Sequence, residues 1–227
     1  MVYDRIIAFN NSITVYRHGD KCIKRYAPPH TPSAVYLEAF NMAKVKQLTS
    51  LLVPKVYGVA QSEEYTEIMT EYIEGKTLAQ ILLSNPCCEQ IVDDFIKIQL
   101  SVHAHSSPFL NGETPNNQPI DLCACENKVL CHGNFSLENI IQTENGNFYI
   151  IGWQNAFFAN AEKDCAITYM LLKYQLNDDI AENYLQKYCA IRQIDSQAVT
   201  SEREWAVNFL ITNSIGRRKK YFQNLIK

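Results

Sequence analysis

The chain has 227 residues, of which 47% are hydrophobic and 20% are charged, so its composition is that of one large globular domain or two small lobes. Its 21 Lys and Arg residues against 24 Asp and Glu residues give a formal net charge of -3, which excludes an overall positive field that would hold nucleic acid or an anionic membrane. No apolar run approaches the roughly 18 residues of a membrane span, and the first residues lack the apolar segment of a secretory signal, so we expect a cytoplasmic protein.

The first quarter of the chain is predicted to form a sheet. Short runs rich in β-branched and aromatic residues at 6–8, 13–16 and 22–26 are separated by turn-forming clusters, which predicts an antiparallel meander. Two further strands are predicted at 53–59 and 66–73. Together these runs indicate a five-stranded sheet.

One helix is predicted between the third and fourth strands. Pro32 and Ser33 offer a helix start, and apolar residues then recur at spacings of three and four, as an amphipathic helix requires. These apolar positions are Tyr36, Phe40, Ala43, Val45, Leu48 and Leu52.

The composition changes at 74–77, where a glycine and a threonine precede a short helical stretch. We therefore predict a first lobe, the N-lobe, over residues 1–73 and a second, mainly helical lobe, the C-lobe, over residues 74–227. A surface loop is predicted over 111–119, where Gly, Pro and Asn are frequent.

Three features are predicted within the second lobe. Ile91, Phe95, Ile98 and Val102 mark the core stripe of a longer helix. An Asn-Gly pair between two apolar runs predicts a β-hairpin over residues 139–151. The remainder, 164–227, has helical spacing and predicts two to four helices.

One segment resembles the catalytic loop of the aminoglycoside phosphotransferase and choline kinase family. That family's pattern is His-Gly-Asp, four residues, then Asn, and this chain has His132, Gly133, Asn134 and, after four residues, Asn139. Downstream, the segment 149–153 resembles the family's Ile-Asp-Trp metal strand, with glycine at position 152 in place of the aspartate.

Other segments follow the order of the same family. Lys24 corresponds to its phosphate-binding lysine and Glu38 to the helix partner of that lysine. Asp164 begins a segment like the family's Asp-Leu-Ala, and residues 53–58 resemble its fourth strand. A segment that resembles the interlobe hinge implies nucleotide contacts by Met69, Glu71 and Ile73.

The resemblance covers residues 6–172 and implies a protein-kinase-like α+β fold of two lobes. The expected N-lobe is a five-stranded antiparallel sheet with one helix, and the expected C-lobe is mainly helical with a catalytic-loop hairpin. A nucleotide or small-molecule ligand would then bind in the cleft between the lobes, with a protein partner possible and no role for nucleic acid or membrane.

Both carboxylates that phosphoryl transfer needs are replaced. Transfer requires a carboxylate that orients the attacking hydroxyl and takes its proton, and metal ions that neutralise developing charge. Asn134 can accept a hydrogen bond but cannot hold the proton. Gly152 has no ligand atom, which leaves Asn139 as a single weak ligand for magnesium. ATP binding therefore stays possible, whereas magnesium binding is expected to be weak or absent.

The positions that would bind a nucleotide match the family pattern better than the positions that would catalyse phosphoryl transfer. We therefore expect a catalytically impaired, pseudokinase-like binding or regulatory module. His132 is expected to brace the backbone rather than donate a proton, and Phe135 and Trp153 could fill the space left by the two carboxylates.

Two alternatives stay open. The first is an active ATP-dependent phosphotransferase acting on a small hydroxyl or amine substrate, in which Glu138, Glu162 or Asp164 supplies a substitute acid. The second is a protein whose cleft is closed and whose activity lies on another surface.

Two further alternatives are a zinc site at the cysteines and a binding surface at one cationic run. The eight cysteines are scattered, so we expect reduced thiols, and a zinc site from Cys123, Cys125, Cys131 and His132 is disfavoured by its spacing. Residues 217–220 are all cationic and could contact phosphates or a partner, but such a run is more typical of a solvated final helix with its cations near the C-terminal end.

Overall fold

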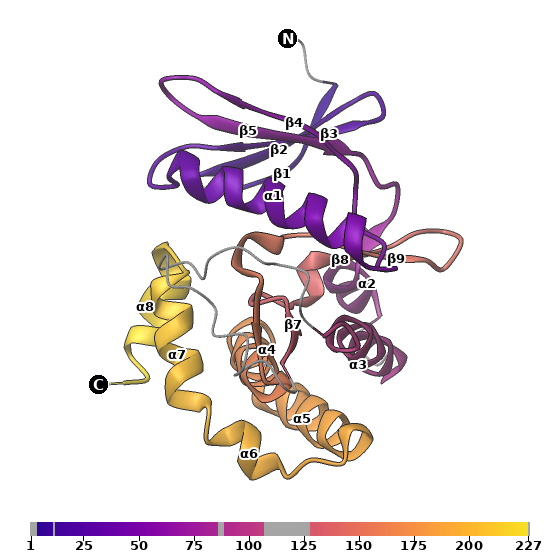
Figure 1. Ribbon diagram of the computed structural model, residues 1–227, viewed down its shortest axis with the longest axis vertical. Coiled ribbons are helices and arrows are strands. Elements are labelled where there is room, and N and C mark those ends of the chain that lie inside the picture. Colours follow the sequence, from indigo (N-terminus) through magenta and orange to yellow (C-terminus); the bar gives the residue numbers. More distant parts are fainter. Residues whose placement is uncertain (1–3, 11, 86–88, 107–127, 227) are drawn as a thin grey trace. The chain divides into compact units, whose positions relative to one another are not determined.

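The computed structural model describes residues 4–10, 12–85, 89–106 and 128–226 (Figure 1). The chain separates into two compact units, and each unit is built from two stretches of sequence. Unit 1 comprises Met1–Thr77 and Asn139–Gln154, and unit 2 comprises Leu78–Glu138 and Asn155–Lys227.

A five-stranded antiparallel sheet forms the centre of unit 1, as the sequence predicts. The strand order is β1-β2-β3-β5-β4, so the first three strands are a meander and the last two form a second hairpin. Lys24 on β3 lies opposite Val15 on β2 and Ile68 on β5, which places it in the middle of the sheet. The strands are β1 (Arg5–Phe9), β2 (Ile13–His18), β3 (Lys21–Tyr26), β4 (Val56–Gln61) and β5 (Thr66–Glu71).

Helix α1 (Pro32–Leu48) packs on one face of this sheet (Figure 1). It starts where the sequence predicts, because Pro32 occupies the first helical turn and the side chain of Thr31 accepts a hydrogen bond from the Ala34 N–H. Its apolar stripe is rotated from the predicted one. Tyr36 and Phe40 are 48% and 51% exposed.

The buried side of α1 instead carries one acidic, one amide and four apolar side chains. Since Glu38 must face the sheet to reach Lys24, the stripe that contains it is turned inward. That buried side comprises Val35, Glu38, Ala39, Asn41, Met42 and Val45.

The predicted hairpin is present and belongs to unit 1. Strands β8 (Ile140–Gln142) and β9 (Phe148–Ile150) pair with each other, and β6 (Lys76–Thr77) adds a third strand. The Ile150 N–H donates to the Leu52 carbonyl oxygen at 2.9 Å, which ties the hairpin to the segment after α1. The division between the units therefore falls after Thr77 and includes the hairpin in the first unit, whereas the lobes as predicted place it in the second.

Unit 2 is mainly helical. Helix α4 lies in its interior, where ten of its fifteen residues are buried, and it packs against α5 and α7. Two short strands, β7 and β10, pair antiparallel, and β7 ends at Cys131, immediately before His132. The elements of unit 2 are α2 (Leu78–Ser84), α3 (Glu89–His103), β7 (Val129–Cys131), β10 (Phe157–Ala159), α4 (Ala161–Gln175), α5 (Asp178–Arg192), α6 (Ser196–Thr200), α7 (Arg203–Thr212) and α8 (Gly216–Gln223).

The part from α4 onward contains five helices, where the sequence analysis expects two to four. The extra helices arise because short segments at 194–195 and 213–215 interrupt a pattern that keeps its helical spacing. The predicted loop at 111–119 lies outside the described residues. Among the helices of the described ranges, none is long and apolar enough to cross a lipid bilayer.

Candidate functional site

The predicted ion pair between Lys24 and Glu38 is formed in unit 1. The Nζ atom of Lys24 lies 3.0 Å from Oε1 and 3.4 Å from Oε2 of Glu38, whose side chain is almost fully buried. Tyr26, on the same face of β3 as Lys24, donates its phenol proton to Oε2 of Glu38. Burial, and then the Glu38 charge, raise the pKa of Tyr26 well above its usual value, so the phenol stays a donor.

Tyr26 was not among the predicted site residues. The signal that could have found it is the strand period of two, which places Tyr26 beside Lys24 on the face that α1 covers. The two donors together hold the carboxylate of Glu38 in one position.

The segment predicted to be the hinge begins within β5. Met69 and Glu71 share one half-buried face of that strand, and Ile73 lies just beyond its end. The carboxylate of Glu71 accepts a hydrogen bond from the Lys55 N–H at 3.1 Å, while the Glu71 N–H donates to the Lys55 carbonyl oxygen at 2.8 Å. Glu71 thus fixes the start of the hinge through the backbone.

A side chain at position 152 would meet the carboxamide group of Asn139. Gly152 has a φ of +79°, a conformation that favours glycine, and a Cβ atom there would lie 2.8 Å from Oδ1 of Asn139. The Asn139 side chain therefore lies beside Gly152. Trp153 is buried with its indole N–H donating to the Ile150 carbonyl oxygen at 3.0 Å.

These residues do not fit a magnesium site. Magnesium prefers hard oxygen ligands in near-octahedral geometry, usually with one or two carboxylates. Position 152 offers no ligand atom, and Asn139 offers one amide oxygen that packs against the Gly152 backbone.

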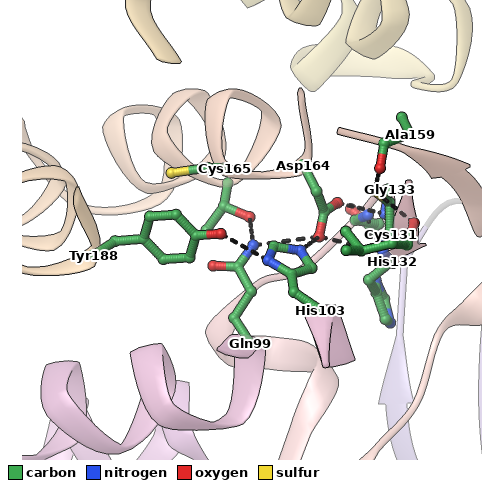
Figure 2. A network of polar contacts seen from close by, with 12 residues as sticks. Gln99, His103, Cys131, His132, Gly133, Ala159, Asp164, Cys165 and Tyr188 are labelled. Atoms are coloured by element: carbon green, nitrogen blue, oxygen red, sulfur yellow. Dashed lines mark hydrogen bonds and ion pairs between the residues drawn. The ribbon is translucent and has the colours of Figure 1, made fainter. Parts of the chain in front are cut away.

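In unit 2, the buried carboxylate of Asp164 braces the segment His132–Gly133–Asn134, which we call the His-Gly-Asn loop (Figure 2). Its Oδ1 accepts the Gly133 N–H at 2.8 Å, and its Oδ2 accepts the His132 N–H at 3.2 Å. His103 Nε2 lies 3.0 Å from Oδ2, and the other ring nitrogen of His103 lies 2.7 Å from the Tyr188 hydroxyl.

The charge of Asp164 is stabilised by these partners. Burial opposes the charged form, yet the hydrogen bond and charge of His103 and the hydrogen bond from Gly133 hold the pKa of Asp164 below its usual value. With 0% of its surface exposed, Asp164 cannot reach a reacting hydroxyl and is a bracing residue. This removes it from the predicted substitute acids.

The His-Gly-Asn loop is shaped by further close contacts. Gly133 has a φ of +71°, and a Cβ there would lie 2.2 Å from the Asn155 carbonyl oxygen, so only glycine fits. The imidazole of His132 is fully buried, and its Nδ1 accepts the Asn134 N–H at 3.2 Å. This geometry fits the expected bracing role of His132.

Arg218 contacts the side chain of Asn134. Its Nη1 donates to Oδ1 of Asn134 at 3.1 Å, and its Nε donates to Oγ of Ser214 at 2.9 Å. The expectation that residues 217–220 lie near the C-terminal end of a solvated helix is wrong for Arg218, because α8 begins at Gly216 and Arg218 is half-buried in its first turn, whereas Lys220 lies in the last turn. Nothing in the sequence pattern points to a contact across 84 positions.

The other proposed substitute acids lie in different environments. Glu138 is exposed and its Oε2 accepts a hydrogen bond from Gln175 at 3.3 Å, whereas Glu162 is half-buried in the first turn of α4.

Cys131 is a buried thiol in β7. Burial raises its pKa well above the usual value, and its Sγ donates to the Val129 and Ala159 carbonyl oxygens. Cys123 and Cys125 lie outside the described residues. Within the described ranges, no group of three His, Cys, Asp or Glu residues could hold a metal ion.

The fold defined by these elements is the α+β, two-lobe protein-kinase-like fold. Among solved structures, the chain is similar to a thermostable mutant of the aminoglycoside phosphotransferase APH(4)-Ia in ternary complex with AMP-PNP and hygromycin B. The TM-score is 0.62 at 12% identity, over 97% of this chain and 90% of that chain.

Two further aminoglycoside phosphotransferases have the same fold. Aminoglycoside-3'-phosphotransferase of type VIII gives a TM-score of 0.55 at 14% identity, over 97% of this chain and 90% of that one. The streptomycin–ATP complex of APH(2")-IIa gives 0.56 at 15% identity, over 96% and 88%. No protein-family model and no curated protein sequence matches the chain.

Replacing Asp164 with Asn should destabilise the protein by about 3–5 kcal/mol at neutral pH, because the loop N–H groups and His103 would lose their charged acceptor. The pKa of Asp164 is depressed in the folded state, so its contribution is complete above about pH 4 and is lost as the pH falls through that lower folded value. The free energy of unfolding, measured with denaturant at a series of pH values, tests this contribution. Asp179→Asn, at an exposed position of α5, should cost no more than about 1 kcal/mol; equal losses in the two variants would contradict the brace.

Gly152→Ala should cost more stability than Gly146→Ala. Both glycines have a positive φ, +79° and +77°, so alanine is strained at each by about 1–2 kcal/mol. Only position 152 has Asn139 within contact of the new Cβ, which adds about 1–3 kcal/mol of overpacking. Chemical denaturation of the two variants tests this, and equal costs would show that Asn139 does not fill position 152.

Proposed function

We propose that this protein is a catalytically impaired, kinase-like module that holds a nucleotide on unit 1 without needing magnesium. The observation that carries the proposal is the contrast within unit 1. The Lys24–Glu38 pair is assembled, while position 152 is a glycine and offers no ligand atom.

Nucleotide binding is supported by the charge and placement of Lys24. The Lys24 side chain, on the central strand of the sheet, is 29% exposed, and the buried carboxylate of Glu38 holds its ammonium group in place. An ammonium group oriented in this way can bind a phosphate as a point charge. The similar solved structures were determined with AMP-PNP and with ATP, which supports a nucleotide as the ligand.

Impaired transfer is supported by the chemistry of Asn134. An amide oxygen orients a hydroxyl but cannot take its proton, and general-base catalysis typically contributes about 10²–10⁴ in rate. Arg218 adds a positive charge at the same amide oxygen, which disfavours the positive charge that an accepted proton would bring.

The alternative is an active phosphotransferase that uses a substitute carboxylate. With Asp164 engaged as a brace, that reading depends on Glu138 or Glu162. It requires a metal-bound nucleotide, since the charge that develops on the transferring phosphoryl group must be neutralised. Magnesium dependence of nucleotide binding therefore separates the two readings.

Thermal unfolding should show stabilisation by ATP and by ADP that does not increase when magnesium replaces EDTA. Lys24→Met should weaken this binding about 10–100-fold, since a charge-assisted contact to phosphate is lost. Lys21→Met is the matched control, because Lys21 lies on the same strand but on its opposite face, and it should bind as the natural protein does.

Stabilisation that appears only with magnesium would contradict the proposal and favour the active enzyme. No stabilisation in either condition would show that the protein does not bind these nucleotides, and would favour a protein that acts through another surface. Each variant is compared with its own unfolding temperature in the absence of nucleotide, so a change in its intrinsic stability does not affect the result.

A further inference from the structure

The guanidinium group of Arg218 is oriented by two neutral oxygen atoms. Asn134 Oδ1 accepts from Nη1 at 3.1 Å, and Ser214 Oγ accepts from Nε at 2.9 Å, while the Ser214 side chain is itself buried. A guanidinium has five N–H donors in a planar fork. Within the described residues, these two contacts leave three of the five without a protein acceptor.

The positive charge of Arg218 has no carboxylate in contact among the described residues. Burial disfavours this charge and lowers the pKa of the guanidinium, while Glu138, the carboxylate that acts on it, raises that pKa without forming an ion pair. Retaining a charge at a partly buried position is costly unless an opposite charge accompanies it.

The neighbours of Arg218 on α8 increase the local positive charge. Arg217, Lys219 and Lys220 belong to the same helix, and none of the three forms an ion pair within the described part of the chain. Arg217 and Arg218 lie in the first turn of a helix that has no acidic residue there, where the helix dipole disfavours cations.

The amide at position 134 has a specific consequence for this charge. A carboxylate there would pair with Arg218 and cancel its charge, whereas the amide oxygen orients the guanidinium through a hydrogen bond and leaves the charge in place. The replacement that removes a proton acceptor thus creates an oriented cation beside the His-Gly-Asn loop.

We propose that Arg218, oriented by Asn134 and Ser214, binds an oxyanion, either a phosphate or a carboxylate group, at the His-Gly-Asn loop. This inference rests on the proposed function, because it names the chemical class of ligand that the module takes. The oxyanion comes either from a phosphate of the nucleotide itself or from a separate anionic molecule.

The experiment titrates the full-length protein with inorganic phosphate and, separately, with acetate, at constant ionic strength. Binding is followed by ¹⁵N NMR of the Arg Nε–H groups and of the Asn134 side-chain amide. We expect both the Arg218 and the Asn134 signals to shift on saturation. Arg218→Gln should weaken phosphate binding at least about tenfold, as expected for the loss of a charge-assisted bidentate contact.

Two further variants keep the test specific. Arg217→Gln removes the same charge from an exposed neighbouring position and should weaken binding less than about threefold, since only a screened surface charge is lost. Arg218→Lys keeps the charge without the planar fork and should show intermediate affinity. Equal weakening in Arg217→Gln and Arg218→Gln, or no response of the natural protein to millimolar phosphate or acetate, would overturn the proposal.

The same titration repeated with saturating ATP separates the two sources. If the oxyanion is a nucleotide phosphate, ATP shifts the Arg218 signal and excludes inorganic phosphate; if it is a separate molecule, phosphate binds equally well to the ATP-bound protein. ATP binding without any response to phosphate or acetate would refute the oxyanion site and leave the proposed function intact. Phosphate binding at Arg218 without ATP binding would support the oxyanion site and refute the proposed nucleotide binding.

Discussion

The buried carboxylate of Asp164 sets the backbone conformation of the His-Gly-Asn loop. It accepts the N–H groups of His132 and Gly133 on one side and the imidazole of His103 on the other, and none of its surface reaches solvent. Because a buried carboxylate without partners would be very costly, the loop and helices α3 and α4 depend on one another through this single group. Figure 2 shows how the three segments converge on it.

Because of this dependence, the backbone conformation of the loop does not require a carboxylate at position 134. The brace acts on backbone N–H groups and on a glycine conformation, neither of which involves the side chain at position 134. The side chain at position 134 can therefore differ in chemistry without changing the contacts that set the loop conformation. In unit 1, the same separation exists between Lys24, which is held by Glu38, and Gly152, which supplies no ligand.

Much of the fold could be predicted from sequence because its signals are local. The five strands have alternating or β-branched runs bounded by turn residues, and the hairpin has an Asn-Gly turn, so each is specified within a few residues. The pairing of Lys24 with Glu38 was predicted from motif order alone. Its geometry also accounts for the inward stripe of α1, which hydrophobic spacing alone assigned to another side.

The features that could not be predicted are contacts between distant parts of the chain. The position of Arg218 beside Asn134 depends on how α8 packs within unit 2, and a run of four cations contains no information about it. The filling of position 152 by Asn139 likewise depends on the backbone of the hairpin, because the sequence shows a glycine without showing its φ. Contacts of this kind are set by tertiary packing and are not visible in a local motif.

The most direct test of impaired catalysis is the rate of ADP formation from ATP in the presence of magnesium, with water as the phosphoryl acceptor. The natural protein and Lys24→Met are purified identically, so that a contaminating ATPase contributes equally to both. The account predicts the same slow rate for the two proteins, indistinguishable from that in EDTA. A magnesium-dependent rate in the natural protein that is abolished in Lys24→Met would contradict it.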